Sequence, residues 1–299
     1  MFKKSTWLHL RIPFSYFLLP VFLFALAVSV NINPTSIVIV LVALHIFLYP
    51  ASNGFNSYFD KDTDSIGGLK NPPPVSKGLY YVSLTFDVIA VALGLMINYD
   101  FAIMLVIYGL VSKAYSHPSI RLKKHPITSW LVAGFFQGCF TFLMVYVGLN
   151  DFSFTTVLNP TVLTPAILTS MILWGSYPMT QIYQHQADKE RGDITLSYKL
   201  GINGTFYFTA IMFAISTLGF LYYFQTYYSF SYWLDFLIAL SPVLLYFTIW
   251  FIQVKQEATK ANYTRTMWLN FISATCLNAF FVYFFLDSSQ LVQAIHGGF

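Results

Sequence analysis

Residues 34–64 have the sequence PTSIVIVLVALHIFLYPASNGFNSYFDKDTD, in which a long apolar run is followed by three carboxylates within five residues. A helix needs roughly 20 mostly apolar residues to cross the hydrocarbon core of a bilayer, and this run is long enough. Asp60, Asp62 and Asp64 stand at its end. Because charge at a membrane edge is costly unless it is paired or used, this cluster is a candidate functional site.

The rest of the chain has the same membrane character. Of its 299 residues, 57% are hydrophobic and only 9% are Asp, Glu, Lys or Arg, whereas a soluble domain carries about 25% charged residues. This composition excludes a soluble enzyme, a disordered chain and a nucleic-acid-binding protein, so no nucleic acid partner is expected. Cys139 and Cys276 lie in apolar runs and are interpreted as small buried hydrophobic residues.

Nine segments are apolar and long enough to be interpreted as membrane-spanning helices. They are residues 13–30, 34–57, 79–97, 100–116, 128–149, 161–183, 203–225, 232–254 and 267–288. Turn residues or charges separate them, for example at Asn98 to Asp100 and at Asn150 to Pro160. The first run is too long for a signal peptide and lacks a clear cleavage site, so we interpret it as a span.

The distribution of charge predicts the orientation of the helices. All 16 Lys and Arg residues lie before the first span, or in or at the edges of the loops that follow spans two, four, six and eight. The opposite side carries Asp100, Asp151, Asp235 and Asp287 and no basic residue. The positive-inside rule therefore predicts a cytoplasmic N-terminus and a C-terminus outside. We expect one polytopic all-α membrane domain over residues 1–299.

The first acidic cluster has the spacing of a helix face. If the second span continues as a helix, then Asn56, Asp60 and Asp64 lie four residues apart on one side. Clustered carboxylates repel one another unless a cation binds them, and Mg²⁺ commonly joins one or two carboxylates to phosphate oxygens. The alternative is a solvated, turn-forming acidic loop.

A second polar cluster follows the sixth span, on the same side of the membrane. Gln181, Gln184 and Asp188 have helical spacing and are expected to share a face. Hydrogen bonding between helices would account for the two glutamines alone, but it does not explain why two polar clusters occur on one side of the membrane.

A basic segment, residues 113–124, lies between the two clusters in sequence. Its lysines and arginine would allow one site to hold a metal and a polyanion together, since Arg presents a planar fork to phosphate and Lys a point charge. For Lys123 and Lys124, a purely topological role is equally compatible with the pattern.

Together these segments resemble the UbiA superfamily of membrane prenyltransferases, along most of the chain. Asn56, Asp60 and Asp64 match its first acidic motif. The other matching segments are Tyr115-Ser116-x-Pro118-x-x-Arg121-Leu122-Lys123 and Asp188-x-x-x-Gly192-x-x-Thr195-Leu196-x-x-x-Leu200-Gly201.

The resemblance implies nine helices around a central cavity and a transferase that uses Mg²⁺. An isoprenyl diphosphate would ionise there and alkylate a lipophilic, aromatic acceptor within the bilayer, which we expect to be a bacterial inner membrane. The implied catalytic and metal-binding residues are Asp60, Asp64 and Asp188, with Asn56 as a further metal ligand. The implied substrate-binding residues are Asn53, Asn56, Lys70, Lys113, Tyr115, Ser116, Arg121, Lys123, Gln184 and Arg191.

The chain departs from the family pattern at three charged positions. Ser57 replaces an aspartate and Asn71 an arginine. Gln184, or Gln181 in another alignment, replaces the earlier carboxylate of the family's second acidic motif, which follows the sixth helix. These changes leave two alternatives open: a terpene cyclase of the same family, and a non-catalytic lipid- or quinone-binding or transport protein. Compensation by Asp62, Lys70 or Glu190 is a hypothesis from proximity in sequence.

Asp87 lies inside the third predicted span, about two helical turns from its cytoplasmic end. Such a carboxylate is costly unless it is paired or hydrated. It would serve either as a general base or hydrogen-bond partner for an acceptor hydroxyl, or as a structural hydrogen-bonding group to a neighbouring helix.

Overall fold

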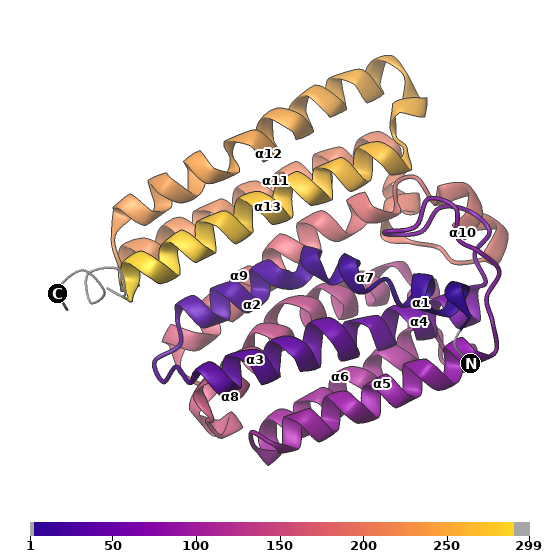
Figure 1. Cartoon of the computed structure of the whole chain (residues 1–299). Helices are drawn as coiled ribbons and strands as arrows, with labels where there is room; N and C mark the ends of the chain where they lie inside the picture. The colour runs from indigo at the N-terminus through magenta and orange to yellow at the C-terminus, as the bar shows by residue number, and fades with distance from the viewer. Residues whose placement is uncertain (1–2, 290–299) are drawn as a thin grey trace.

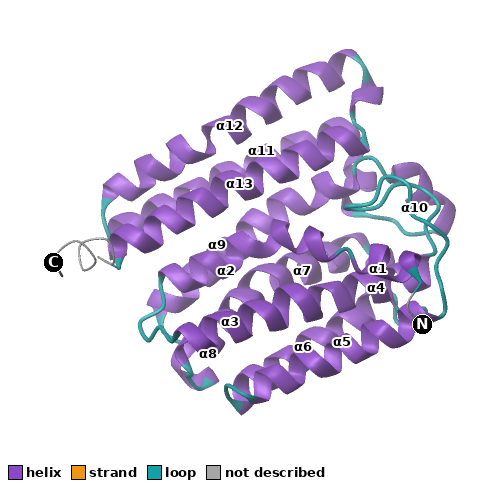
Figure 2. Ribbon diagram, in the orientation of Figure 1, coloured by secondary structure: helices purple, strands orange, loops and turns teal. Residues whose placement is uncertain are grey.

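The computed structural model describes residues 3–289, and within them the chain forms helices and turns with one isolated β-bridge, between Ile66 and Leu69 (Figures 1 and 2). The principal helices are α1 (Lys4–Leu10), α2 (Leu19–Ala27), α3 (Pro34–Val42), α4 (Tyr49–Asp60), α5 (Gly78–Leu95), α6 (Tyr99–Ser116), α7 (Pro126–Phe135), α8 (Thr141–Asn150), α9 (Pro160–Ser176), α10 (His185–Arg191), α11 (Leu196–Tyr227), α12 (Phe230–Gln256) and α13 (Tyr263–Ser288). Short 3₁₀ and π turns join several of them. They are η1 (Ile12–Leu18), η2 (Ala43–Leu48), η3 (Leu122–Lys124), η4 (Phe136–Phe140), η5 (Phe154–Val157), η6 (Tyr177–Gln181) and η7 (Ala258–Lys260).

Asparagine residues start several of these helices. The side chains of Asn33, Asn98, Asn159 and Asn262 each accept a hydrogen bond from a backbone N–H in the first turn of α3, α6, α9 and α13. An N-cap satisfies one of the donors that a helix leaves unpaired, and asparagine suits this position. The polar residues that separate the predicted spans therefore also cap the helices that follow them.

Seven helical segments in the described part of the chain are long and apolar enough to cross a membrane. They are Lys4–Ala27, Pro34–Asp60, Gly78–Leu95, Pro126–Asn150, Leu196–Tyr227, Phe230–Gln256 and Tyr263–Ser288. The all-helical, polytopic class is confirmed, whereas the count of nine stays a prediction. The two predicted spans outside this set correspond to α6, which carries Asp100 and Lys113 within 18 residues, and α9, which is 17 residues long.

Some spans are interrupted helices. The first begins at Lys4, earlier than predicted, and Arg11 takes a left-handed conformation with φ of 50° between α1 and η1. The π turns η2 and η4 interrupt the second span and the span that contains α7 and α8. Turns of this kind often occur at functional sites.

An aromatic core closes the end of the bundle that carries few charges. The ring of Phe24 stacks on Phe281 with centroids 4.4 Å apart, and Phe220 stacks on Phe236 at 4.4 Å. Offset and edge-to-face rings pack with little empty space.

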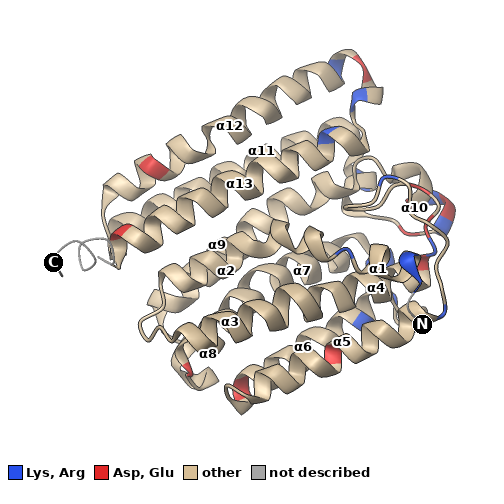
Figure 3. Ribbon diagram, in the orientation of Figure 1, with Lys and Arg blue, Asp and Glu red and all other residues tan. Residues whose placement is uncertain are grey.

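The charged residues gather at the two ends of the bundle, as Figure 3 shows. Basic residues lie mainly at the end that carries α10, and the other end has acidic residues. One pair lies between the ends, Asp87 on α5 and Lys113 on α6, joined by an Oδ2–Nζ distance of 2.5 Å.

Candidate active site

The C-terminal end of α4 provides the first part of the site. Asn56 and Asp60 are one helical turn apart, and α4 ends at Asp60 because Lys61 adopts a left-handed conformation with φ of 51°. Asp64 is therefore in the following loop and is exposed, so it does not share the helix face as the spacing had predicted for a continuing helix. The side chain of Asp62, in contrast, is only 6% exposed.

Asp60 and Asn56 are held by the basic segment between α6 and α7. Lys123 forms an ion pair with Asp60, and its Nζ also donates to Asn56 Oδ1 at 3.1 Å. Ser116, the last residue of α6, donates its hydroxyl proton to the same oxygen at 2.6 Å. The two segments that sequence analysis selected are thus in contact.

The segment around α10 adds two more carboxylates. Arg191 donates to Asp188 Oδ1 at 2.6 Å and forms an ion pair with Asp62. Asp193 accepts two hydrogen bonds from Arg121, at 2.9 and 2.8 Å, and Arg121 Nη2 lies 3.5 Å from Asp60. Seven residues in all form what we call the aspartate network: Asp60, Asp62, Asp188, Asp193, Arg121, Lys123 and Arg191.

Asp193 was not predicted to be a site residue, although it is only 3% exposed and bridges two of the arginines. It follows Gly192, whose φ of 73° ends α10 and turns the chain back. A glycine directly after a short helix, followed by Asp, is the sequence signal that was available for this turn.

Asp188 is the carboxyl group of the network whose pKa is raised. Burial raises the pKa of Asp188 to about 7, and repulsion from Asp193 and Asp60 adds to this against the opposing effect of Lys123. Its Oδ2 is buried and has no hydrogen-bond partner among the described residues. An unpaired carboxylate oxygen in this position favours a bound cation.

Other predicted residues have different surroundings. Lys113 does not join the network, because its Nζ pairs with Asp87 and lies 5.2 Å from the ring centroid of Phe55. Lys70 is exposed. Gln184 donates to the carbonyl oxygen of Ser65 at 3.2 Å, a bond that a carboxylate at this position could not donate.

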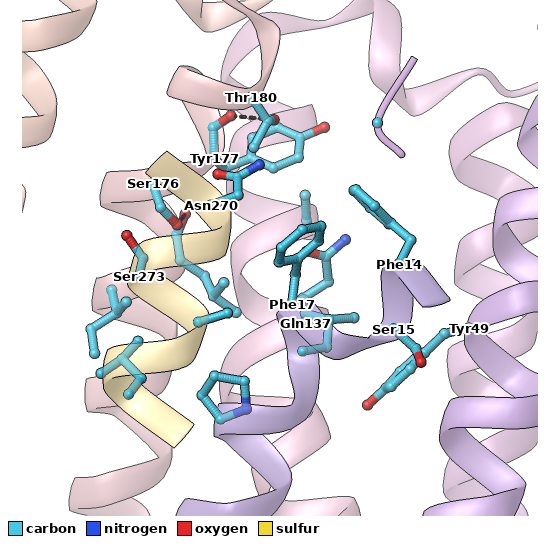
Figure 4. A pocket seen from close by; sticks show the side chains of 18 of the residues that line it. Phe14, Ser15, Phe17, Tyr49, Gln137, Ser176, Tyr177, Thr180, Asn270 and Ser273 are labelled. Carbon is cyan, nitrogen blue, oxygen red and sulfur yellow. Dashed lines mark hydrogen bonds between the residues drawn. The ribbon is translucent and has the colours of Figure 1, made fainter. Parts of the chain in front are cut away.

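A cavity of about 410 Å³ extends into the bundle beside the network. Asn53, Asn56, Tyr115, Ser116 and Gln184 line it near the network, and most of the remaining lining is apolar or aromatic. Figure 4 shows part of this lining, including Tyr49 and Tyr177. Tyr115 and Tyr177 are hydrogen-bonded to each other through their hydroxyl groups.

Arg11 is the one ionised side chain among the described residues that line the cavity. It donates to the carbonyl oxygens of Gly67 at 2.9 Å and Asn53 at 3.3 Å, and within the described residues it pairs with no carboxylate. From its position before the first predicted span, Arg11 was expected only to help orient the helices, since nothing in its local sequence places it in a cavity.

The family model for the UbiA prenyltransferase family matches residues 17–273 of the chain. The chain belongs to this family. No curated protein sequence matches it. Among solved structures, the chain is similar to a UbiA homolog from Archaeoglobus fulgidus bound to GPP and Mg²⁺, with 16% identity, a TM-score of 0.66, and coverage of 94% of this chain and 99% of that one.

A second similar structure is the apo form of a UbiA homolog from Aeropyrum pernix K1, with 15% identity, a TM-score of 0.69, and coverage of 91% and 98%. A third concerns digeranylgeranylglyceryl phosphate synthase, with 18% identity, a TM-score of 0.60, and coverage of 94% and 98%. At these identities the similarity shows the fold. The family and the apolar helices together make this UbiA-family chain an integral membrane protein.

Proposed function

We propose that the protein is a membrane prenyltransferase that binds an Mg²⁺-isoprenyl diphosphate complex at the aspartate network and alkylates a lipophilic, aromatic acceptor in the cavity. The observation that carries this proposal is the position of Asp60 and Asp188, which come from distant segments into one buried network beside an apolar cavity. Two of the A. fulgidus structures contain Mg²⁺ with GPP or DMAPP.

The donor atoms suit a metal that is shared with a substrate. Within residues 3–289, no group of three His, Cys, Asp or Glu side chains converges to hold a metal alone. Mg²⁺, however, commonly takes only one or two carboxylates and completes its shell with phosphate oxygens and water. We propose Asp60 and Asp188 as its ligands, with Asn56 supporting them. Asp64, also a candidate ligand, is exposed and would need the loop after α4 to move.

The cations of the network would bind the diphosphate. Arg121, Lys123 and Arg191 are each paired with aspartates. If a metal neutralises these carboxylates, the three cations are released to donate to phosphate oxygens, Arg as a fork and Lys as a point charge. We place Asn53, Tyr115, Ser116 and Gln184 at the cavity end of the diphosphate. Lys113 is left out, because Asp87 pairs with it.

In the reaction, the bond between the allylic carbon and the diphosphate oxygen breaks, and the electron pair leaves with the diphosphate. Bound Mg²⁺ supplies positive charge that stabilises the leaving group. The acceptor carbon attacks the allylic cation and then loses a proton. The aromatic lining, which includes Tyr49, Tyr108 and Phe136, offers ring faces to the cation and excludes water from it.

Orientation and location are proposed from charge. We propose that the end with the aspartate network faces the cytoplasm, with the N-terminus inside and the C-terminus outside, in a bacterial inner membrane. We also propose that residues 1–299 form one domain, since the helices described pack into one bundle around the cavity.

One observation favours a second candidate, a non-catalytic lipid- or quinone-binding protein. Each carboxylate of the network already has a cationic partner from the chain itself, so the site is largely neutralised without metal. Such a protein would bind ligands in the cavity without needing Mg²⁺.

Release of inorganic diphosphate from geranyl diphosphate separates the two candidates. The detergent-purified protein is assayed with Mg²⁺, with and without a mixture of lipophilic phenols. Asp60→Asn and Asp188→Asn should each lower release at least 100-fold, and Asp235→Asn, at the opposite end of the bundle, should not. Release that requires a phenol indicates transfer, and release without one indicates a cyclase. If no diphosphate is released under any condition, both the prenyltransferase and the cyclase are contradicted, and the non-catalytic candidate remains.

A further inference from the structure

Two amide side chains in the cavity have no role in the donor site. Gln137 belongs to the π turn η4 and Asn270 to α13, and both line the cavity (Figure 4). Neither side chain makes a hydrogen bond to another described residue. Two unbonded amides from different helices thus face one cavity.

These amides lie roughly two to three helical turns inside the bundle. Asn270 is seven residues beyond the start of α13 and Gln137 eleven beyond the start of α7, which places them roughly 10 and 16 Å from those helix ends at 1.5 Å per residue. A polar group at such a depth is costly unless it has a partner. An isoprenoid tail is a hydrocarbon and offers neither a donor nor an acceptor, so the donor substrate does not account for them.

The surroundings of the amides are polar but uncharged. Ser273 lies one helical turn from Asn270, and Tyr49 also lines the cavity. Arg11, the one ionised lining residue described, is held by its bonds to the carbonyl oxygens of Gly67 and Asn53. An anionic group beside the amides would be desolvated without a counter-charge, whereas a neutral hydroxyl or carbonyl would gain hydrogen bonds.

We propose that Gln137 and Asn270 recognise the acceptor through a neutral ring oxygen, so that the acceptor is an uncharged phenol rather than an aromatic acid. This inference rests on the proposed prenyl transfer. One amide carbonyl accepts the phenol proton and the other amide donates to the phenol oxygen. A ring hydroxyl also makes the ring electron-rich, as attack on an allylic cation requires. The two residues therefore determine specificity and orient the ring.

The test uses three probes of equal chain length: 4-butylphenol, butylbenzene and 4-butylbenzoate. Their dissociation constants are measured on the full-length, detergent-purified protein and on the Gln137→Leu and Asn270→Leu variants. Asn278→Leu is the matched control, because Asn278 is a buried amide on α13 outside the cavity lining. Arg11→Gln tests the acid alternative.

Wild-type protein should bind butylphenol at least tenfold more tightly than butylbenzene, with butylbenzoate no tighter than butylbenzene. Each leucine variant should reduce the phenol preference about fivefold, the effect expected for one hydrogen bond, and Asn278→Leu should leave it unchanged. A wild-type phenol preference near one, or one unaffected by both leucine variants, would overturn the proposal. So would butylbenzoate binding more tightly than butylphenol and losing that affinity in Arg11→Gln.

Mg²⁺-dependent binding of geranyl diphosphate is measured in parallel, and it should be unchanged in both leucine variants. If geranyl diphosphate does not bind to the wild type, the proposed function fails, while the phenol preference is still measured. The two results therefore fail separately.

Discussion

The ion pair between Asp87 and Lys113 gives a quantitative test of the structure. Their side chains are 19% and 16% exposed, and the pair joins α5 to the last turn of α6. Removing one partner of a buried pair leaves the other charge unpaired and costs about 3–5 kcal/mol. We therefore expect Asp87→Leu alone, or Lys113→Met alone, to lower the free energy of unfolding by about that amount.

The double variant Asp87→Leu with Lys113→Met should behave differently. Replacing a buried ion pair by apolar side chains of similar volume is often neutral or stabilising. The two single variants should lower the midpoint of thermal unfolding in detergent by roughly 10 °C, whereas the double variant should return it close to that of the wild type. Binding of Mg²⁺ and geranyl diphosphate should survive in the double variant, because Lys113 does not contact the aspartate network.

A double variant as unstable as the two single variants would refute the pairing. Loss of geranyl diphosphate binding in a stable double variant would show instead that Lys113 contacts the substrate, as the family resemblance implies. Asp235→Asn controls for the general effect of removing a carboxylate, since Asp235 lies in the second turn of α12 and accepts only a hydrogen bond from Tyr283.

Three further predictions concern Asp188, Asp193 and the loop that carries Gly67. Because burial raises the pKa of Asp188 to about 7, this carboxyl is protonated below that pH, so Mg²⁺-dependent binding of geranyl diphosphate should be weaker at pH 6 than at pH 8. A raised pKa also favours the folded form at low pH, so the stability that Asp188 contributes should be lost as the pH rises from about 4 to 7. The metal-free wild type should therefore melt at a lower temperature at pH 8 than at pH 4, and Asp188→Asn should remove this difference. Asp193→Asn removes a carboxylate that repels Asp188 and should lower the pH midpoint of geranyl diphosphate binding, whereas an unchanged midpoint would count against this role. The same substitution gives Arg121 a neutral acceptor at position 193 in place of a carboxylate. It should lower the free energy of chemical unfolding by about 2 kcal/mol. A Cβ atom on Gly67 would lie 2.6 Å from the ring of Phe14, so Gly67→Val should displace the loop and increase its cleavage by added protease; unchanged cleavage would contradict the packing.

Much of the fold was predictable because its causes are local. Apolar runs of spanning length predict helices wherever the solvent is lipid, and asparagine residues such as Asn98 and Asn262 begin helices through their own side chains. The count of spans was less predictable. It depends on where a helix stops, and Ser176 gives way to a 3₁₀ turn within the segment predicted as the sixth span.

The candidate site was predictable where a residue acts through a repeated helical spacing. Asn56, Asp60 and Asp188 were selected in this way, and they meet in or beside the network. Asp64 was selected by the same spacing but lies apart from the network, because the left-handed turn at Lys61 ends the helix before it. A residue in that conformation carries no clear sequence signal unless it is glycine or asparagine.

The ion pairs between distant segments could not be predicted from the sequence. Lys113 contacts Asp87 rather than the network, and Arg121 contacts Asp193. Each choice depends on which side chains two distant segments bring together. The environment of Arg11 is decided in the same way, by the loop that carries Gly67.

The most direct test of the central claim is the affinity of the purified protein for geranyl diphosphate, measured with and without Mg²⁺ in the wild type, Asp60→Asn and Asp188→Asn. Our account predicts tight binding that needs Mg²⁺ and falls at least tenfold in both variants, with Asp235→Asn unaffected. Binding that is indifferent to Mg²⁺ and to both substitutions would contradict it, and the protein would then be a ligand-binding member of the UbiA family without prenyl transfer.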